Sequence, residues 1–154
     1  VWEETVANRK RMMEVCPQVD FYISATVGLS NALHVVDFHR NWVEQGFIKP
    51  QDFNFNLLQF PLWQRMDLLP PEEKQMVKEK YEKHMAWLKK KDHLTRATKG
   101  FESALDYMMR RDKSDKMPLF IAETKKYDKI RNETFTDVFP EWKDLFDKYD
   151  TQKT

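Results

Sequence analysis

Hydrophobic and polar residues alternate along two short segments of the chain. Residues 19–27 place apolar side chains at every second position, and residues 53–58 repeat this pattern from Phe53 onward. A period of two is typical of a β-strand with one buried face. We therefore predict strands over 19–27 and 53–58, each with its polar side chains on the opposite face.

Most of the remaining sequence has the longer period of helices. Apolar residues recur three and four apart between the predicted strands, where Ser30 or Asn31 is placed to cap a helix and Gly46 to end it. The same period predicts helices over 2–15, 71–90, 96–110, 118–131 and 139–149, with a frayed tail over 151–154. A strand, a helix and a strand in this order predict a right-handed parallel crossover. The expected fold class is therefore helix-dominated α/β with two or three parallel strands.

The composition limits the functions that the chain can have. Its 154 residues fit one domain, and 26 basic residues against 25 acidic ones give no attraction to nucleic acid or an anionic membrane. No apolar run reaches the length of a membrane span. The single cysteine, Cys16, has no partner for an internal disulfide, which is typical of a reducing compartment. We expect a cytoplasmic protein that binds neither nucleic acid nor membrane.

The first residues of the chain already have a helical pattern. Val1-Trp2-Glu3 leads directly into the predicted helix over 2–15, a pattern typical of the middle of a domain. We expect a truncated reading frame; a processed product and an excised domain are the alternatives.

The four histidines do not follow a metal-binding pattern. His34 and His39 lie five residues apart on one predicted helix, so they point from different faces, unlike the i, i+4 pair of a zinc helix. The sequence also lacks a phosphate-binding glycine loop and the Gly-x-Ser-x-Gly turn of a nucleophile. We assign no metal ligand and no catalytic residue. A small hydrolase has little support, because no nucleophile with a base is identified.

Small polar residues near the carboxyl ends of the predicted strands form the candidate site. Ligands of parallel α/β proteins bind where these ends converge. Asparagine is depleted in strands, so its appearance twice in the second predicted strand needs an explanation. A polar ligand that binds these side chains would explain it. The alternatives to a ligand site are a solvated sheet face and a buried hydrogen-bond network. The candidates are Ser24, Thr26, Asn31, Asn54 and Asn56.

Several short motifs resemble those of one known family, and together they extend over most of the chain. They are Ser24-Ala25-Thr26-Val27 with Ser30-Asn31, Phe53-Asn54-Phe55-Asn56-Leu57-Leu58 with Pro61, Leu69-Pro70-Pro71-Glu72-Glu73-Lys74, and Tyr127-Asp128-Lys129-Ile130-Arg131-Asn132 with Phe135-Thr136-Asp137-Val138-Phe139-Pro140-Glu141. The chain thereby resembles the C-terminal half of radical S-adenosylmethionine enzymes of the twitch/SPASM-like branch.

The resemblance implies a fold, a pocket and a missing part. Residues 1–60 would form a portion of a (β/α)₆ barrel, and residues 61–154 a helical C-terminal region packed on it as one compact unit. The five candidate residues would line the pocket for S-adenosylmethionine and substrate. The family's Cys-x-x-x-Cys-x-x-Cys loop, which holds a 4Fe-4S cluster, is absent, and Cys16 alone cannot supply three thiolates. We expect the chain to carry no cofactor as it stands and to be inactive alone, as a fragment or as a relative that has lost the chemistry.

The alternative function is a non-catalytic helical module for protein interaction. Amphipathic helices support it, together with a surplus of aromatic residues that we expect to be exposed, among them Trp42, Trp63, Trp87 and Trp142. Both functions predict association, because a sheet of two or three strands has open edges. We expect a homodimer, and a small-molecule or peptide substrate for a full-length protein.

Overall fold

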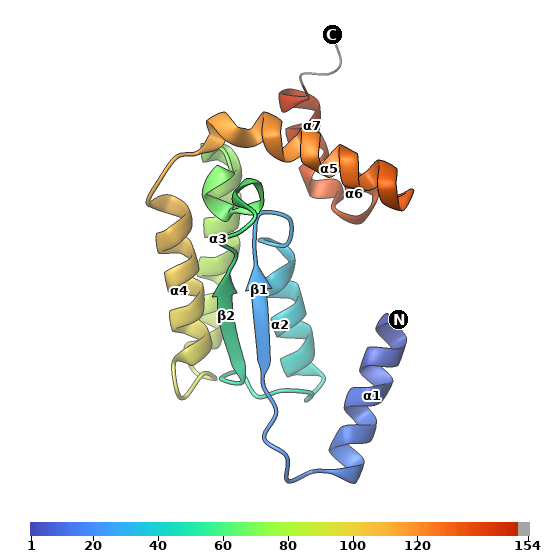
Figure 1. Cartoon of the computed structure of the whole chain (residues 1–154). Helices are drawn as coiled ribbons and strands as arrows, with labels where there is room; N and C mark the ends of the chain where they lie inside the picture. Colours follow the sequence, from blue (N-terminus) through green and yellow to red (C-terminus); the bar gives the residue numbers. More distant parts are fainter. Residues whose placement is uncertain (151–154) are drawn as a thin grey trace.

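The computed structural model describes residues 1–150, and within them the chain forms seven α-helices and two parallel strands (Figure 1). The main elements are α1 (Trp2–Val15), β1 (Ile23–Val27), α2 (His34–Glu44), β2 (Phe53–Leu57), α3 (Pro71–Leu88), α4 (Arg96–Met109), α5 (Met117–Arg131), α6 (Phe135–Val138) and α7 (Lys143–Tyr149). Short 3₁₀ turns are η1 (Leu62–Gln64), η2 (Met66–Leu68), η3 (Ser114–Lys116) and η4 (Pro140–Trp142). The helix-dominated α/β class that the sequence predicts is confirmed.

The two strands pair in parallel with their residues in direct register. Ile23 lies opposite Phe53, and Val27 lies opposite Leu57. Helix α2 connects the strands, as the order of the sequence patterns predicts. Among residues 1–150 the sheet has no third strand, so each of its strands has one edge without a neighbouring strand.

Helices cover one face of this sheet. Helix α4 packs against β2, and α2 and α3 lie behind the strands in Figure 1. The contact is aromatic: the ring of Phe101 on α4 lies parallel to that of Phe53 and edge-on to that of Phe55, with centroids 6.5 and 4.6 Å apart. Gly100 permits this close approach, because a Cβ there would lie 2.4 Å from the ring of Phe55. The apolar positions of the alternating pattern therefore form the buried face.

Four details differ from the sequence expectation. The predicted last helix over 139–149 begins only at Lys143, because Pro140–Trp142 forms the 3₁₀ turn η4. Strand β1 begins at Ile23, because residues 19–22 have no neighbouring strand and Val19 is exposed. Helix α2 begins at His34 without a side-chain cap, since Asn31 bonds to backbone groups before the helix instead. Helix α6 was not predicted, because four residues are too few to show a period. The predicted fraying over 151–154 falls outside the described residues.

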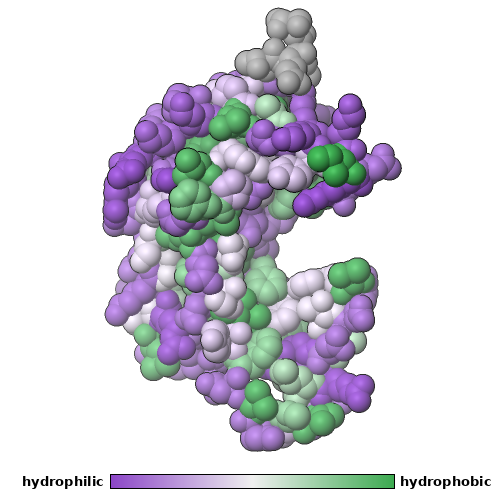
Figure 2. All heavy atoms as spheres, viewed as in Figure 1, coloured by the Kyte–Doolittle hydropathy of each residue, from purple (hydrophilic) through white to green (hydrophobic). Residues whose placement is uncertain are grey.

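Helix α1 has no buried residue. Its Trp2 ring contacts Phe38 and Trp42 of α2, with centroids 6.1 and 6.0 Å apart. Arg9 donates from Nε and Nη2 to the carbonyl of Phe47, at 2.8 and 2.6 Å. Figure 2 shows a hollow between α1 and the helices at the C-terminal end of the chain. Helix α1 is therefore held at one side and open at the other.

Candidate functional site

Four of the predicted residues form a row on the face of the sheet that the helices leave open. We call Ser24, Thr26, Asn54 and Asn56 the polar row. The register places Ser24 beside Asn54 and Thr26 beside Asn56, and the Nδ2 of Asn56 donates to the Oγ of Ser24 at 2.6 Å. Asn54 is half-buried, and the other three residues are exposed. The structure therefore brings together four of the five candidates. Ser24 and Asn54 are the second residues of β1 and β2, so they lie near the amino ends of the strands, and their predicted position near the carboxyl ends is wrong.

Part of the polar row has no partner for its hydrogen-bonding groups. Within the described residues, neither the amide of Asn54 nor the hydroxyl of Thr26 makes a side-chain hydrogen bond. An asparagine amide offers two donors and two acceptor positions. Asn54 is half-buried and Thr26 is exposed, so both groups can bind water or a polar ligand.

The fifth candidate, Asn31, has a local structural role. Its Oδ1 accepts a hydrogen bond from the backbone N–H of Gly28, and its Nδ2 donates to the carbonyl of Thr26, both at 2.9 Å. This side chain therefore holds the loop after β1 in a tight turn. A Cβ on Gly28 would lie 2.8 Å from the carbonyl oxygen of Gln64, so the loop also packs closely against the segment after β2. Both sides of the asparagine amide are thus used within the fold.

A groove lies at the carboxyl ends of the strands, beyond the polar row. One part is a hollow of about 260 Å³ lined by Thr26, Asn31, Gln64 and Phe139, among others. It adjoins a hollow of about 450 Å³ that shares Ser30, Gln64 and Phe139 with it and continues along α5 and α6. The wall on α5 has polar side chains next to aromatic ones: Thr124, Tyr127, Asp128 and Arg131.

The C-terminal helices close one side of this groove through contacts with the loop after β1. The indole Nε1 of Trp142 donates to the carbonyl of Ser30 at 3.0 Å, and Trp142 is fully buried. His34 at the start of α2 pairs with Glu141. Its ring also packs edge-on against Phe139, with centroids 5.1 Å apart. Residues far apart in the sequence therefore form one site.

Aromatic and charged side chains give the groove its chemistry. Trp63 stacks on Tyr127 with centroids 5.9 Å apart, and the guanidinium of Arg131 lies over the Tyr127 ring at 5.5 Å. Asp128 accepts a hydrogen bond from the backbone N–H of Phe135 at 2.9 Å, which fixes the turn between α5 and α6. Such a surface suits a ligand with both a planar and a polar part.

Sequence reasoning missed Gln64 and the residues of α5 in this groove. Gln64 had one usable signal, since it lies in the connection that leaves the carboxyl end of β2, where ligand sites gather in parallel α/β folds. Asp128 belongs to a motif of the family resemblance, but nothing in that motif places it at the groove. Thr124 had no signal, because only the tertiary fold brings α5 over this edge.

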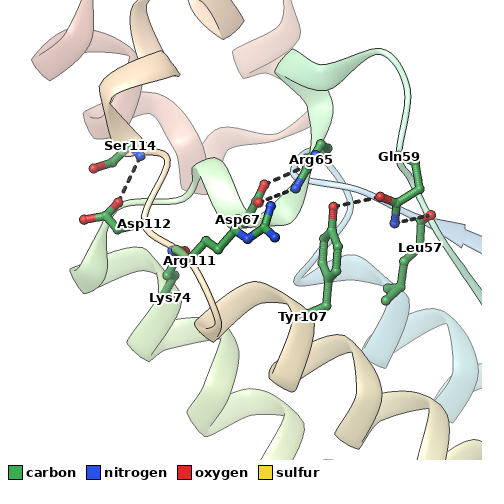
Figure 3. Close-up of polar contacts among 9 residues, drawn as sticks. All are labelled: Leu57, Gln59, Arg65, Asp67, Lys74, Tyr107, Arg111, Asp112 and Ser114. Atoms are coloured by element: carbon green, nitrogen blue, oxygen red, sulfur yellow. Dashed lines mark hydrogen bonds and ion pairs between the residues drawn. The ribbon is translucent and has the colours of Figure 1, made fainter.

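A second polar cluster lies beside the carboxyl end of β2 (Figure 3). Arg65 binds the carboxylate of Asp67 with its Nε and Nη2, at 3.1 and 2.5 Å, and Asp67 is buried. The hydrogen bond to Asp67 raises the pKa of Arg65 above its usual value. The hydroxyl of Tyr107 donates to Gln59, whose amide reaches the carbonyl of Leu57, the last residue of β2.

Two buried histidines, His39 of α2 and His84 of α3, contact each other on the face of the sheet that the helices cover. The Nδ1 of His39 lies 2.9 Å from the Nε2 of His84, and the Nε2 of His39 lies 3.0 Å from the carbonyl of Pro50. Because a carbonyl only accepts, His39 carries its proton on Nε2 and accepts from His84 on Nδ1. Burial lowers the pKa of His39 to about 4 and that of His84 to about 3, so both rings are neutral at pH 7. The pair joins α2 to α3 as a structural contact.

The residues present do not fit an iron–sulfur cluster. Cys16, the single thiol of the sequence, is half-buried beside Phe21 and Asp52 at the amino ends of the strands, opposite the groove. No group of three or more histidine, cysteine or acidic side chains in residues 1–150 is arranged to hold a metal ion. None of the helices in this part of the chain is long and apolar enough to cross a membrane. In comparisons with known proteins, no family model, no curated protein and no solved structure matches this chain.

Proposed function

We propose that this chain forms one wall of a ligand pocket in a radical S-adenosylmethionine-like enzyme and supplies none of the cluster ligands. The polar row and the adjoining groove would contact cofactor or substrate. Radical chemistry in such enzymes comes from the cluster and its cofactor, so we expect no catalysis from these residues alone.

The observation that carries this proposal is the division of the sheet into two unlike faces. Helices cover the face of Phe53 and Phe55, while the opposite face presents the polar row without a covering element among the described residues. In a (β/α) barrel the helices lie outside the strands, and the opposite face of each strand points into the barrel. Two parallel strands joined by a helix are compatible with this arrangement.

The side-chain groups of the polar row that lack a hydrogen-bond partner favour the binding of a polar ligand. Asn54 and Thr26 have hydrogen-bonding capacity that no other residue of the described chain uses. S-adenosylmethionine has hydroxyl, amino and carboxylate groups that amide and hydroxyl side chains can bind. The planar adenine would suit the aromatic side of the groove near Trp63 and Tyr127.

Titration calorimetry of S-adenosylmethionine into the purified chain tests the proposal. We expect saturable binding that the double variant Asn54→Leu, Asn56→Leu weakens by about tenfold or more, because two hydrogen-bonding side chains are lost. Asn8→Leu is the control, since Asn8 is an exposed asparagine on α1 and does not belong to the polar row. Equal affinity of the wild type, the double variant and the control for S-adenosylmethionine would contradict the proposal. So would the absence of binding by a folded wild-type sample.

A non-catalytic interaction module is the second candidate. The absence of any buried residue on α1 favours it, together with the open edges of the sheet in the described chain. The tryptophans expected to be exposed do not support it, because Trp42 and Trp142 are buried and Trp63 and Trp87 are half-buried. Exposed Trp2, Val15 and Tyr22 would instead contact a partner, and a homodimer is the simplest case. Light scattering on the sample used for calorimetry tests this: a dimer without S-adenosylmethionine binding favours the module, and a monomer contradicts the homodimer.

A further inference from the structure

A third hollow, which shares Trp63 of η1 with the groove, combines exposed leucines with a cluster of cations. We call it the basic pocket and define it by Leu62, Arg65, Arg111, Lys113, Lys116 and Leu119. Its volume is about 280 Å³. We propose that the basic pocket binds an acidic peptide segment that presents an aliphatic side chain. This proposal does not depend on the proposed function.

The apolar part of the basic pocket is exposed. Leu62 and Leu119 are 54% and 46% exposed, and they belong to η1 and α5. Leu68 beneath them is buried. Exposed leucines that meet in a hollow, rather than singly on a convex surface, are typical of a contact site.

The cations around this hollow exceed the carboxylates available to them. Arg65 is neutralised by Asp67, and Lys116 pairs with Asp115 at 3.2 Å. The carboxylate of Asp112, between Arg111 and Lys113 in the sequence, interacts with the ammonium of Lys74. Arg111 and Lys113 form no ion pair with any residue of the described chain. Two uncompensated positive charges therefore lie beside the leucines, and they attract an anionic partner.

The loop that carries these two cations is fixed in position (Figure 3). The buried ammonium of Lys74 donates to the carbonyl of Arg111 at 2.6 Å, and the backbone N–H of Lys113 donates to the carbonyl of Asp67 at 3.0 Å. Asp112 between them accepts from the N–H of Ser114 at 2.9 Å, a bond that lowers the pKa of Asp112. A fixed loop loses little conformational entropy on binding, which favours a built contact site over a mobile charged surface.

Exposed leucines next to unpaired cations favour the binding of a peptide over that of a simple anion. A phosphate or a free carboxylate would satisfy Arg111 and Lys113 but would leave the leucines exposed. A peptide with an aliphatic side chain between acidic residues satisfies both parts, because its carboxylates reach the cations while the side chain contacts Leu62 and Leu119.

Fluorescence anisotropy tests this with a labelled peptide of sequence Glu-Asp-Leu-Leu-Asp-Glu. We expect saturable binding that weakens with added salt. The variant Arg111→Glu, Lys113→Glu should weaken it by about tenfold or more, because both exposed cations become anions. The variant Lys89→Glu, Lys90→Glu is the matched control, because it makes the same change in charge at two exposed lysines after α3. Its affinity for the peptide should stay within about twofold of that of the wild type.

A second peptide, with serines in place of the leucines, tests the apolar part. It should bind about tenfold more weakly, as the leucine peptide should to the variant Leu62→Ser, Leu119→Ser. Equal binding of the serine peptide, or inorganic phosphate competing as strongly as the leucine peptide, would overturn the proposal in favour of a general anion site. Equal losses in both charge-reversal variants, or no saturable binding, would also overturn it.

Discussion

At the scale of single residues, the two asparagines of β2 differ although they share a face. The side-chain amide of Asn56 donates to the hydroxyl of Ser24, while that of Asn54 has no hydrogen-bond partner in the described chain. The sequence left three alternatives open for these residues: a ligand site, a solvated sheet face and a buried hydrogen-bond network. The bond of Asn56 to Ser24 joins two exposed side chains, so it is not a buried network. A ligand site and a solvated face are both compatible with the unpaired amide of Asn54. Asn31 belongs to neither case, because both ends of its amide hold the loop after β1.

The buried histidine pair makes stability depend on pH. Burial lowers the pKa of His39 to about 4 and of His84 to about 3, whereas an unfolded histidine titrates near 6.5. The unfolded chain therefore binds more protons below about pH 6.5, and stability that is fully present above that pH is lost as the pH falls through the folded values. The slope of the free energy of unfolding against pH should approach ~1.4 kcal/mol per pH unit for each histidine.

Urea unfolding between pH 7 and pH 5 measures this slope. His84→Gln should reduce it by about half, since one of two titrating groups is removed. His93→Gln is the control, because His93 is exposed and should leave the slope unchanged. An equal slope in wild type and in His84→Gln would mean that the pair does not stay neutral in the folded state.

At the scale of elements, the contact of α4 with β2 holds the helical layer on the sheet. This contact depends on Gly100, which lies against the Phe55 ring. The neighbouring core residues Phe101 and Ala104 are fully buried. A glycine within a helix usually costs stability, so its presence here is explained by the close approach.

Gly100→Ala should destabilise the protein. Its Cβ would overlap the Phe55 ring at 2.4 Å, and moving that ring should cost about 1–3 kcal/mol, more than the gain of about 1 kcal/mol in helix propensity. Urea unfolding of Gly100→Ala beside Ser103→Ala, an exposed change on the same helix, gives the comparison. A Gly100→Ala protein as stable as Ser103→Ala would show that β2 and α4 are further apart than the structure has them.

At the scale of the whole molecule, periodicity predicted the elements and the polar row but not the groove beside it. The apolar positions of β1 and β2 and the helical stripes are local signals, so both strands and the longer helices were predicted. The starts of β1 and α7 were predicted four residues too early. The groove depends on contacts such as that of Trp142 with Ser30, which are 112 residues apart. No local pattern encodes a pairing of this kind, nor the bond of Lys74 to the loop at Arg111. The polar row was predictable, because it needs only alternation and register.

The most direct test of the account asks where a ligand binds. Nuclear magnetic resonance of the ¹⁵N-labelled chain, at 18.7 kDa, resolves the side-chain amides of Asn54 and Asn56 during titration with S-adenosylmethionine. We predict that these two amides and the backbone signals of Ser24 and Thr26 shift together to saturation, while that of Asn8 does not move. Saturating shifts confined to other surfaces, with the polar row unmoved, would contradict the claim that this face of the sheet is the wall of a pocket.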